Sequence, residues 1–170
     1  MKLNKVDYLI IHHSATPRDK TTFEAVRRYH IQKGWGDIGY HFFITADGTI
    51  HKGRKEEDVG AHCRASGMNF KSLGICLAGN FTKEYPSAKQ LKSLSSLLNQ
   101  LTVKYLILPD HILGHCEVPG ARTLCPGENL LEWVHIYKAT LPKKKLLYIK
   151  LIRILKRLIE TLKLIKKLKK

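Results

Sequence analysis

The chain has 170 residues, of which 44% are hydrophobic, and a formal net charge of +16. This composition excludes a wholly disordered chain and suits one compact domain with an appendage. The charge is uneven, because residues 143–170 hold twelve Lys or Arg and one Glu, whereas the other 142 residues hold 18 basic and 13 acidic side chains.

The cysteine pattern and the first residues argue against two further classes of protein, namely disulfide-rich proteins and proteins with a signal peptide. The four cysteines show neither a CxxC motif nor the spacing of a disulfide framework, so we expect one metal-binding Cys among ordinary thiols. The first residues lack the pattern of a signal peptide, which predicts a protein that is cytoplasmic when made. No apolar run approaches about 18 residues, the length typical of a transmembrane helix.

The first predicted element is a buried strand at Val6–His13, which is rich in β-branched and aromatic residues. Side chains alternate along a strand, so His12 and His13 face opposite ways. Only one of this histidine pair is therefore expected to join any given site.

A helix and a hairpin follow the first strand. Thr21–Glu24 has the Thr-x-x-Glu pattern of a capping box and predicts a helix that ends near Lys33. Strands at Tyr40–Thr45 and Thr49–Lys52 flank an Asp-Gly turn, which predicts a hairpin. Residues 53–71 are polar and irregular.

The remaining elements alternate between strand and helix. The continuous apolar run Leu73–Ala78 indicates a central strand. Ser87–Gln90 is a second capping box, and leucines at helical spacing extend its helix to about residue 105. A short strand at Ile112–His115 and a helix at Leu130–Lys138 complete the domain. This order predicts an α/β fold with a mixed central β-sheet flanked by helices.

A candidate metal site combines residues distant in sequence. His115 and Cys125 are ten positions apart on a segment shaped by two Pro-Gly pairs. Both side chains are good zinc ligands, and a catalytic zinc usually takes three protein ligands and keeps one position for water. His12, at the C-terminal end of the first strand, is the natural third ligand.

Several sequence blocks in this order resemble the zinc-dependent N-acetylmuramoyl-L-alanine amidases, a family that includes phage lysozymes and the peptidoglycan recognition proteins. The resemblance covers roughly residues 4–137. The blocks that carry it are Ile-Ile-His12-His-Ser-Ala-Thr, Gly39-Tyr-His-Phe, Asp47-Gly-Thr-Ile, Gly60-Ala-His-Cys, Asn69-Phe-Lys-Ser-Leu-Gly-Ile, Gly114-His-Cys-Glu and Cys125-Pro-Gly.

The resemblance implies a zinc-dependent hydrolase that cleaves the amide bond between N-acetylmuramic acid and L-alanine. It implies zinc ligation by His12, His115 and Cys125, a catalytic role for Tyr40, and substrate contacts for His62 and Asn69.

One position departs from the phage and bacterial members of the family, which often carry Lys two residues before the last metal ligand. Thr123 stands there in this chain. Thr donates a hydrogen bond to an oxyanion but brings no charge. We expect Thr123 to act in catalysis, and the neighbouring Arg122 in the substrate groove is the alternative replacement for the lysine. Glu117 is either an orienting residue of the site or a surface charge.

Residues 142–170 are predicted to form a separate cationic amphipathic helix after a domain at 1–141. On a wheel of about 100° per residue, most Leu and Ile gather on one face and most Lys and Arg on the other. This pattern predicts a helix that lies on an anionic membrane surface. The alternative is a helix that docks its apolar stripe on the domain or on a partner. No specific nucleic-acid partner is expected, because Tyr148 is the segment's one aromatic residue.

Together these features favour a phage or prophage endolysin that reaches the cell wall after membrane passage or from outside. Two alternatives stay open: a peptidoglycan-recognition module that does not cut, and a membrane-permeabilising protein targeted by an amidase fold. Retention of the candidate ligands and Tyr40 argues against the first alternative.

Overall fold

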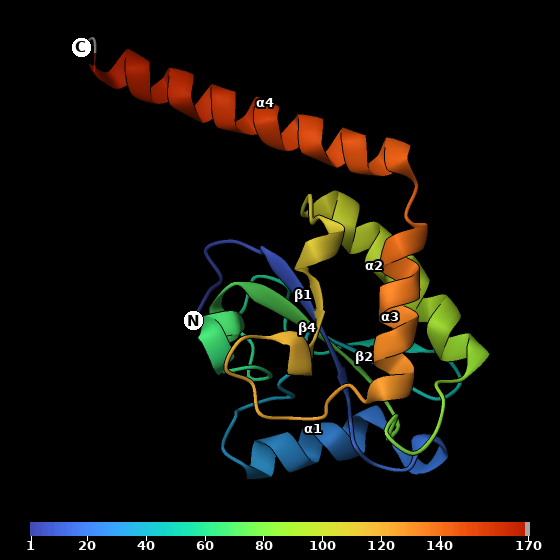
Figure 1. The fold of residues 1–170 in the computed structure, drawn as a ribbon. Helices are drawn as coiled ribbons and strands as arrows, with labels where there is room; N and C mark the ends of the chain where they lie inside the picture. The colour runs from blue at the N-terminus through green and yellow to red at the C-terminus, as the bar shows by residue number, and fades with distance from the viewer. Residues whose placement is uncertain (169–170) are drawn as a thin grey trace.

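A computed structural model describes residues 1–168 and contains one mixed five-stranded sheet in the order β3-β2-β4-β1-β5 (Figure 1). Strand β3 is antiparallel to β2, and the other neighbouring strands are parallel. The predicted α/β class with a mixed central sheet is confirmed. The strands are β1 (Tyr8–His13), β2 (Phe42–Ile44), β3 (Ile50–Lys52), β4 (Ser72–Leu77) and β5 (Ile112–Gly114).

Helices cover both faces of this sheet. The main core lies on the face covered by α2 (Ala88–Lys104) and α3 (Glu128–Thr140), where Leu9 and Ile11 of β1 are fully buried. The other face carries Ile10 and the first helix, α1 (Phe23–Gln32). The alternation predicted for β1 is therefore confirmed, and it places His12 on the face opposite the main core. Short 3-10 turns lie at Arg18–Lys20, Ala65–Phe70, Pro109–His111 and His115–Glu117.

The two predicted capping boxes have different outcomes. Ser87 and Gln90 form the second box at the start of α2, with hydrogen bonds in both directions. The first box is wrong, because Thr22 is the N-cap of α1 and accepts a hydrogen bond from Ala25 N at 3.1 Å. Thr21 instead donates its hydroxyl to Pro17 O. Both adjacent threonines are of a residue type that caps helices. Because Thr21 is bonded to the preceding turn, Thr22 serves as the cap.

Helix α4 (Lys143–Leu168) runs across one end of the molecule, beyond the end of α3 (Figure 1). Its first turns contact the domain, because Ile149 is 1% exposed and Leu146 packs against the main core. From Ile154 onward the described side chains are exposed. Within residues 1–168, no helix combines the length and the apolarity that crossing a membrane requires. The last two residues of the predicted tail, 169–170, lie outside the described part.

Candidate metal centre and active site

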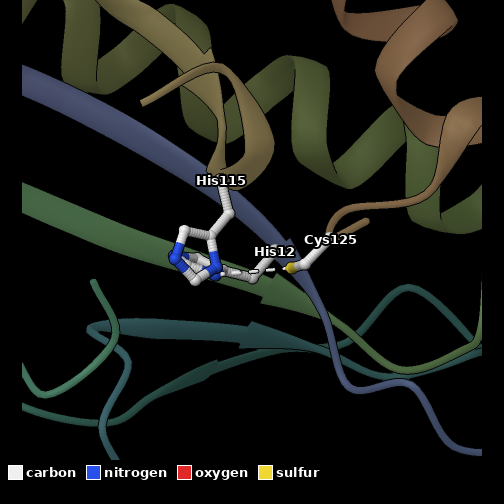
Figure 2. A group of neighbouring side chains, drawn as sticks. All are labelled: His12, His115 and Cys125. Atoms are coloured by element: carbon white, nitrogen blue, oxygen red, sulfur yellow. Dashed lines mark hydrogen bonds between the residues drawn. The ribbon is translucent and has the colours of Figure 1, made fainter. Parts of the chain in front are cut away.

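Three side chains from separate segments gather at the carboxyl ends of the parallel strands (Figure 2). His12 is near the end of β1, His115 follows β5, and Cys125 lies in the loop before α3. One ligand atom from each residue lies within 4.8 Å of the other two. Because β1 and β5 are parallel neighbours, their carboxyl ends bring the two histidines to the same edge of the sheet.

The geometry and chemistry of this cluster fit zinc. His12 Nδ1 and Cys125 Sγ are 3.6 Å apart. Zn–N and Zn–S bonds of about 2.0 and 2.3 Å at a tetrahedral angle give a nitrogen–sulfur separation of about 3.5 Å, close to the distance observed. Burial raises the pKa of the Cys125 thiol to about 12, so its thiolate requires a neighbouring cation. Burial also lowers the pKa of His12 and of His115, which keeps both imidazoles neutral and able to donate a lone pair.

His62 fixes the orientation of the His12 ring. His12 Nε2 and His62 Nδ1 are hydrogen-bonded at 3.0 Å. When His12 Nδ1 donates its lone pair to a metal, His12 Nε2 carries the proton and donates it to His62. The other ring nitrogen of His62, Nε2, has no hydrogen-bond partner within residues 1–168.

Two glycines make room for the His62 ring. A Cβ at Gly74 of β4 would lie 2.5 Å from His62 Cγ, and a Cβ at Gly60 would lie 2.5 Å from His62 Cδ2. Both separations are far below van der Waals contact. The ring is therefore confined on both sides by backbone, which limits its rotation away from His12.

Tyr40 lies beside His12, with the two ring centroids 5.2 Å apart. Burial raises the pKa of Tyr40 well above its ordinary value, so the phenol stays protonated and can donate a hydrogen bond. The adjacent His41 holds this segment in place. His41 Nδ1 accepts a hydrogen bond from Gly74 N at 3.0 Å, and its Nε2 bonds Asp58 O at 2.9 Å.

The structure places the other predicted site residues around this centre. Thr123 Oγ1 accepts a hydrogen bond from Cys125 N at 3.1 Å, which leaves the hydroxyl proton available to donate. Arg122 is exposed on the same loop. Asn69 Oδ1 accepts from the backbone N–H groups of His62 and Cys63, both at 2.8 Å, and so shapes the loop that carries His62. Substrate contact by His62, Asn69 and Arg122 stays a prediction.

Glu117 supports the turn that presents His115. Its carboxylate accepts a hydrogen bond from Gly114 N at 2.6 Å and from His135 Nε2 at 2.8 Å. Of the two alternatives for Glu117, the contacts favour an orienting role through the backbone of the turn. The sequence signal for this role was the three-residue spacing between Gly114 and Glu117, which is the spacing of a helical cap.

Comparisons with known proteins identify related sequences. The profile of the N-acetylmuramoyl-L-alanine amidase family matches residues 2–128. The endolysin of Escherichia phage T7 is 39% identical over 136 residues, which cover 75% of this chain and 84% of that protein.

Solved structures show the same likeness. The N-acetylmuramoyl-L-alanine amidase LysC from Clostridium intestinale has 37% identity and a TM-score of 0.69, and the match covers 78% of this chain and 84% of that one. Peptidoglycan recognition protein-LE, solved in complex with tracheal cytotoxin, a monomeric diaminopimelic acid-type peptidoglycan, has 31% identity and a TM-score of 0.71 over 85% of this chain and 88% of that one.

Proposed function

The chain belongs to the N-acetylmuramoyl-L-alanine amidase family and is an amidase of peptidoglycan, and from this premise we propose that its activity depends on zinc held by His12, His115 and Cys125. The observation that carries the proposal is the convergence of two neutral imidazoles and one thiol on one point, with a nitrogen–sulfur separation of 3.6 Å. The bond cleaved is the amide between the lactyl group of N-acetylmuramic acid and L-alanine.

The chain's own residues supply the positioning for this hydrolysis. When bound, zinc would acidify a water molecule and polarise the lactyl carbonyl. His62 holds His12 in the orientation that presents Nδ1. Tyr40, a protonated phenol beside His12, donates a hydrogen bond to the oxygen on which negative charge develops. Water adds OH to the carbonyl carbon and a proton to the nitrogen, which leaves a lactyl carboxylate and an L-alanine with a free amine.

Thr123 is the second proposed donor to the developing oxyanion. Its oxygen is tied to Cys125 N, so its position is coupled to that of a metal ligand. A neutral hydroxyl stabilises an oxyanion less than a charged ammonium would. Arg122 extends from an exposed position on the same loop and is the alternative source of positive charge near substrate.

We also propose that residues 142–170 act at an anionic membrane surface, in a role distinct from that of the amidase domain at 1–141. The support is the segment's composition of twelve basic residues and one acidic residue, together with the exposure of the leucines of α4 other than Leu146. Such a helix suits an endolysin of phage or prophage origin, which must pass a membrane or approach from outside before it acts on the wall.

Product analysis tests the proposed activity. Purified peptidoglycan is digested by the full chain with zinc, with a chelator, and by a Cys125→Ser variant. We expect new N-terminal L-alanine from the zinc-loaded wild type, and none from the chelator-treated chain or from the variant. In a separate assay, vesicles that contain phosphatidylglycerol should sediment both the wild type and the variant. Absence of N-terminal L-alanine from the zinc-loaded wild type would favour a recognition module that does not cut.

A further inference from the structure

Helix α4 turns one face to the domain, and that face is not its apolar stripe. The side chains in contact with or nearest the domain follow helical spacing: Lys145, Leu146, Ile149, Ile152 and Arg153 are buried or half-buried. Lys145 Nζ donates to Asn99 Oδ1 of α2 at 2.8 Å. Leu146 and Ile149 fall outside the stripe, on the basic side of the helical wheel. Their contact with the domain explains why apolar residues occur on that side.

The apolar stripe points away from the domain. Ile149 and Leu158 are nine residues apart, so at about 100° per residue they lie about 180° apart on the helix. Leu158 is 56% exposed, and the exposed fractions of its neighbours on the stripe range from 52% to 58%. Those neighbours are Leu147, Leu151, Ile154, Leu155 and Leu162. Docking of the stripe on the amidase domain is therefore excluded for the described residues.

Basic side chains border the stripe on both sides. Lys150 and Arg157 lie about 80–100° from Leu158 on one side, and Lys166 lies about 80° away on the other. Long basic side chains at such borders reach phosphate headgroups while the stripe contacts acyl chains. The same charges oppose the pairing of two stripes from two copies of the chain, since each copy brings twelve basic residues.

Helix α4 and the metal cluster lie at opposite ends of the parallel strands. A cavity of about 720 Å³ separates Arg153, Lys156 and Arg157 of α4 from the segments Leu3–Asp7 and Tyr105–Ile107. The first of these segments leads into the amino end of β1, whereas His12 is near its carboxyl end. From Val6 to His12 an extended chain covers about 20 Å. Figure 1 shows α4 crossing one end of the molecule and α1 at the other.

We infer that α4 seats this enzyme on an anionic lipid surface with its active site facing away from the lipid. The inference rests on the proposed function and deepens it by fixing the orientation of the bound enzyme. A bilayer that contacts the exposed stripe lies beyond the amino ends of the parallel strands, with α4 between the lipid and the sheet. The cluster of His12, His115 and Cys125 then lies on the far side of the domain, toward the polymeric wall.

Tryptophan quenching by brominated lipid measures this orientation in the full, zinc-loaded chain. Trp35 packs against His30, with ring centroids 4.5 Å apart, and so reports on the end that carries Tyr40. Trp133 is half-buried in α3, where it stacks on Tyr137. On vesicles of brominated phosphatidylglycerol, the wild type should lose little emission, whereas a Leu158→Trp variant should gain a strongly quenched component. The bound wild type should also cleave a soluble muropeptide within about twofold of its free rate.

A matched pair of variants tests the stripe itself. Leu158→Gln and Leu164→Gln make the same change at two side chains of similar exposed fraction, 56% and 60%. The two positions are about 120° apart on the helix, so Leu158 lies on the stripe and Leu164 lies off it. We expect Leu158→Gln to weaken vesicle binding about tenfold or more and Leu164→Gln to change it less than about twofold.

The outcomes separate the orientation from the proposed function. Vesicle binding with quenched Trp35 emission, or with blocked muropeptide cleavage, would overturn the orientation alone. Failure of the wild type to bind vesicles would overturn the membrane role as well. Dimers in sedimentation velocity that Leu158→Gln dissolves would assign the stripe to a second copy of the chain and would overturn the inference.

Discussion

The metal cluster and the stripe of α4 are assembled in opposite ways. His12 and Cys125 are at most 9% exposed, and they meet across 113 positions of sequence. The stripe residues of α4 are about half-exposed and come from one continuous segment. The cluster depends on the packed fold of the whole domain, whereas the stripe depends on helical periodicity. We therefore expect substitutions at the two regions to change two separate activities.

The largest expected effect is the loss of hydrolysis on removal of a proposed zinc ligand. A His115→Ala variant should lose at least about 10³-fold in the rate of peptidoglycan cleavage, because several kcal/mol of charge stabilisation disappear with the metal. Its affinity for anionic vesicles should equal that of the wild type. Reduced vesicle affinity in this variant would break the separation between the two regions.

A Tyr40→Phe variant should lose about 10²–10³-fold in kcat, since one hydrogen-bond donor to the developing oxyanion is removed. Bound zinc, measured by elemental analysis, should be unchanged. Tyr29→Phe is the matched control, because Tyr29 is 53% exposed on α1. Equal kcat values for the two variants would remove Tyr40 from the catalytic residues.

Zinc affinity should fall by about 10–100-fold in a His62→Gln variant, because His62 hydrogen-bonds His12, a proposed zinc ligand, and would not itself bind the metal. Competition with a chromophoric chelator measures this affinity without reference to activity. His51→Gln on β3 serves as the control histidine. If His62 contacts substrate instead, KM will rise while zinc affinity stays constant.

The smallest expected effect on stability and hydrolysis comes from removal of the outer turns of α4. A chain truncated after Lys150 keeps the anchoring Leu146 and Ile149 but loses most of the stripe. Its Tm should stay within a few degrees of the wild type, and its hydrolysis of purified peptidoglycan within about twofold, while vesicle binding is lost. A large fall in Tm would show that the outer turns of α4 belong to the stability of the domain.

Local sequence signals predicted much of the fold. The strand alternation predicted that only one of His12 and His13 faces the site, and the Ser87–Gln90 capping box located the start of α2. Both signals act within a few residues, where backbone geometry alone decides the outcome. The Thr21–Glu24 box failed because two neighbouring threonines compete for one cap.

Two long-range contacts were not predicted from the sequence. The bond between His12 and His62 joins residues fifty positions apart, and the room for the His62 ring comes from Gly74 on another strand. The face that α4 turns to the domain was also missed. Leu146 and Ile149, two apolar residues off the stripe, were the available signal for that second contact.

Zinc titration of the metal-free protein tests the central claim most directly. The claim is that His12, His115 and Cys125 hold one zinc that the hydrolysis requires. The rate of release of N-terminal L-alanine from a muropeptide should rise linearly with added zinc and level off at one equivalent. Cys125→Ser should stay inactive throughout the titration. Full activity of the metal-free wild type would contradict the requirement for zinc. An equal rise in the rate for Cys125→Ser would contradict zinc binding by Cys125.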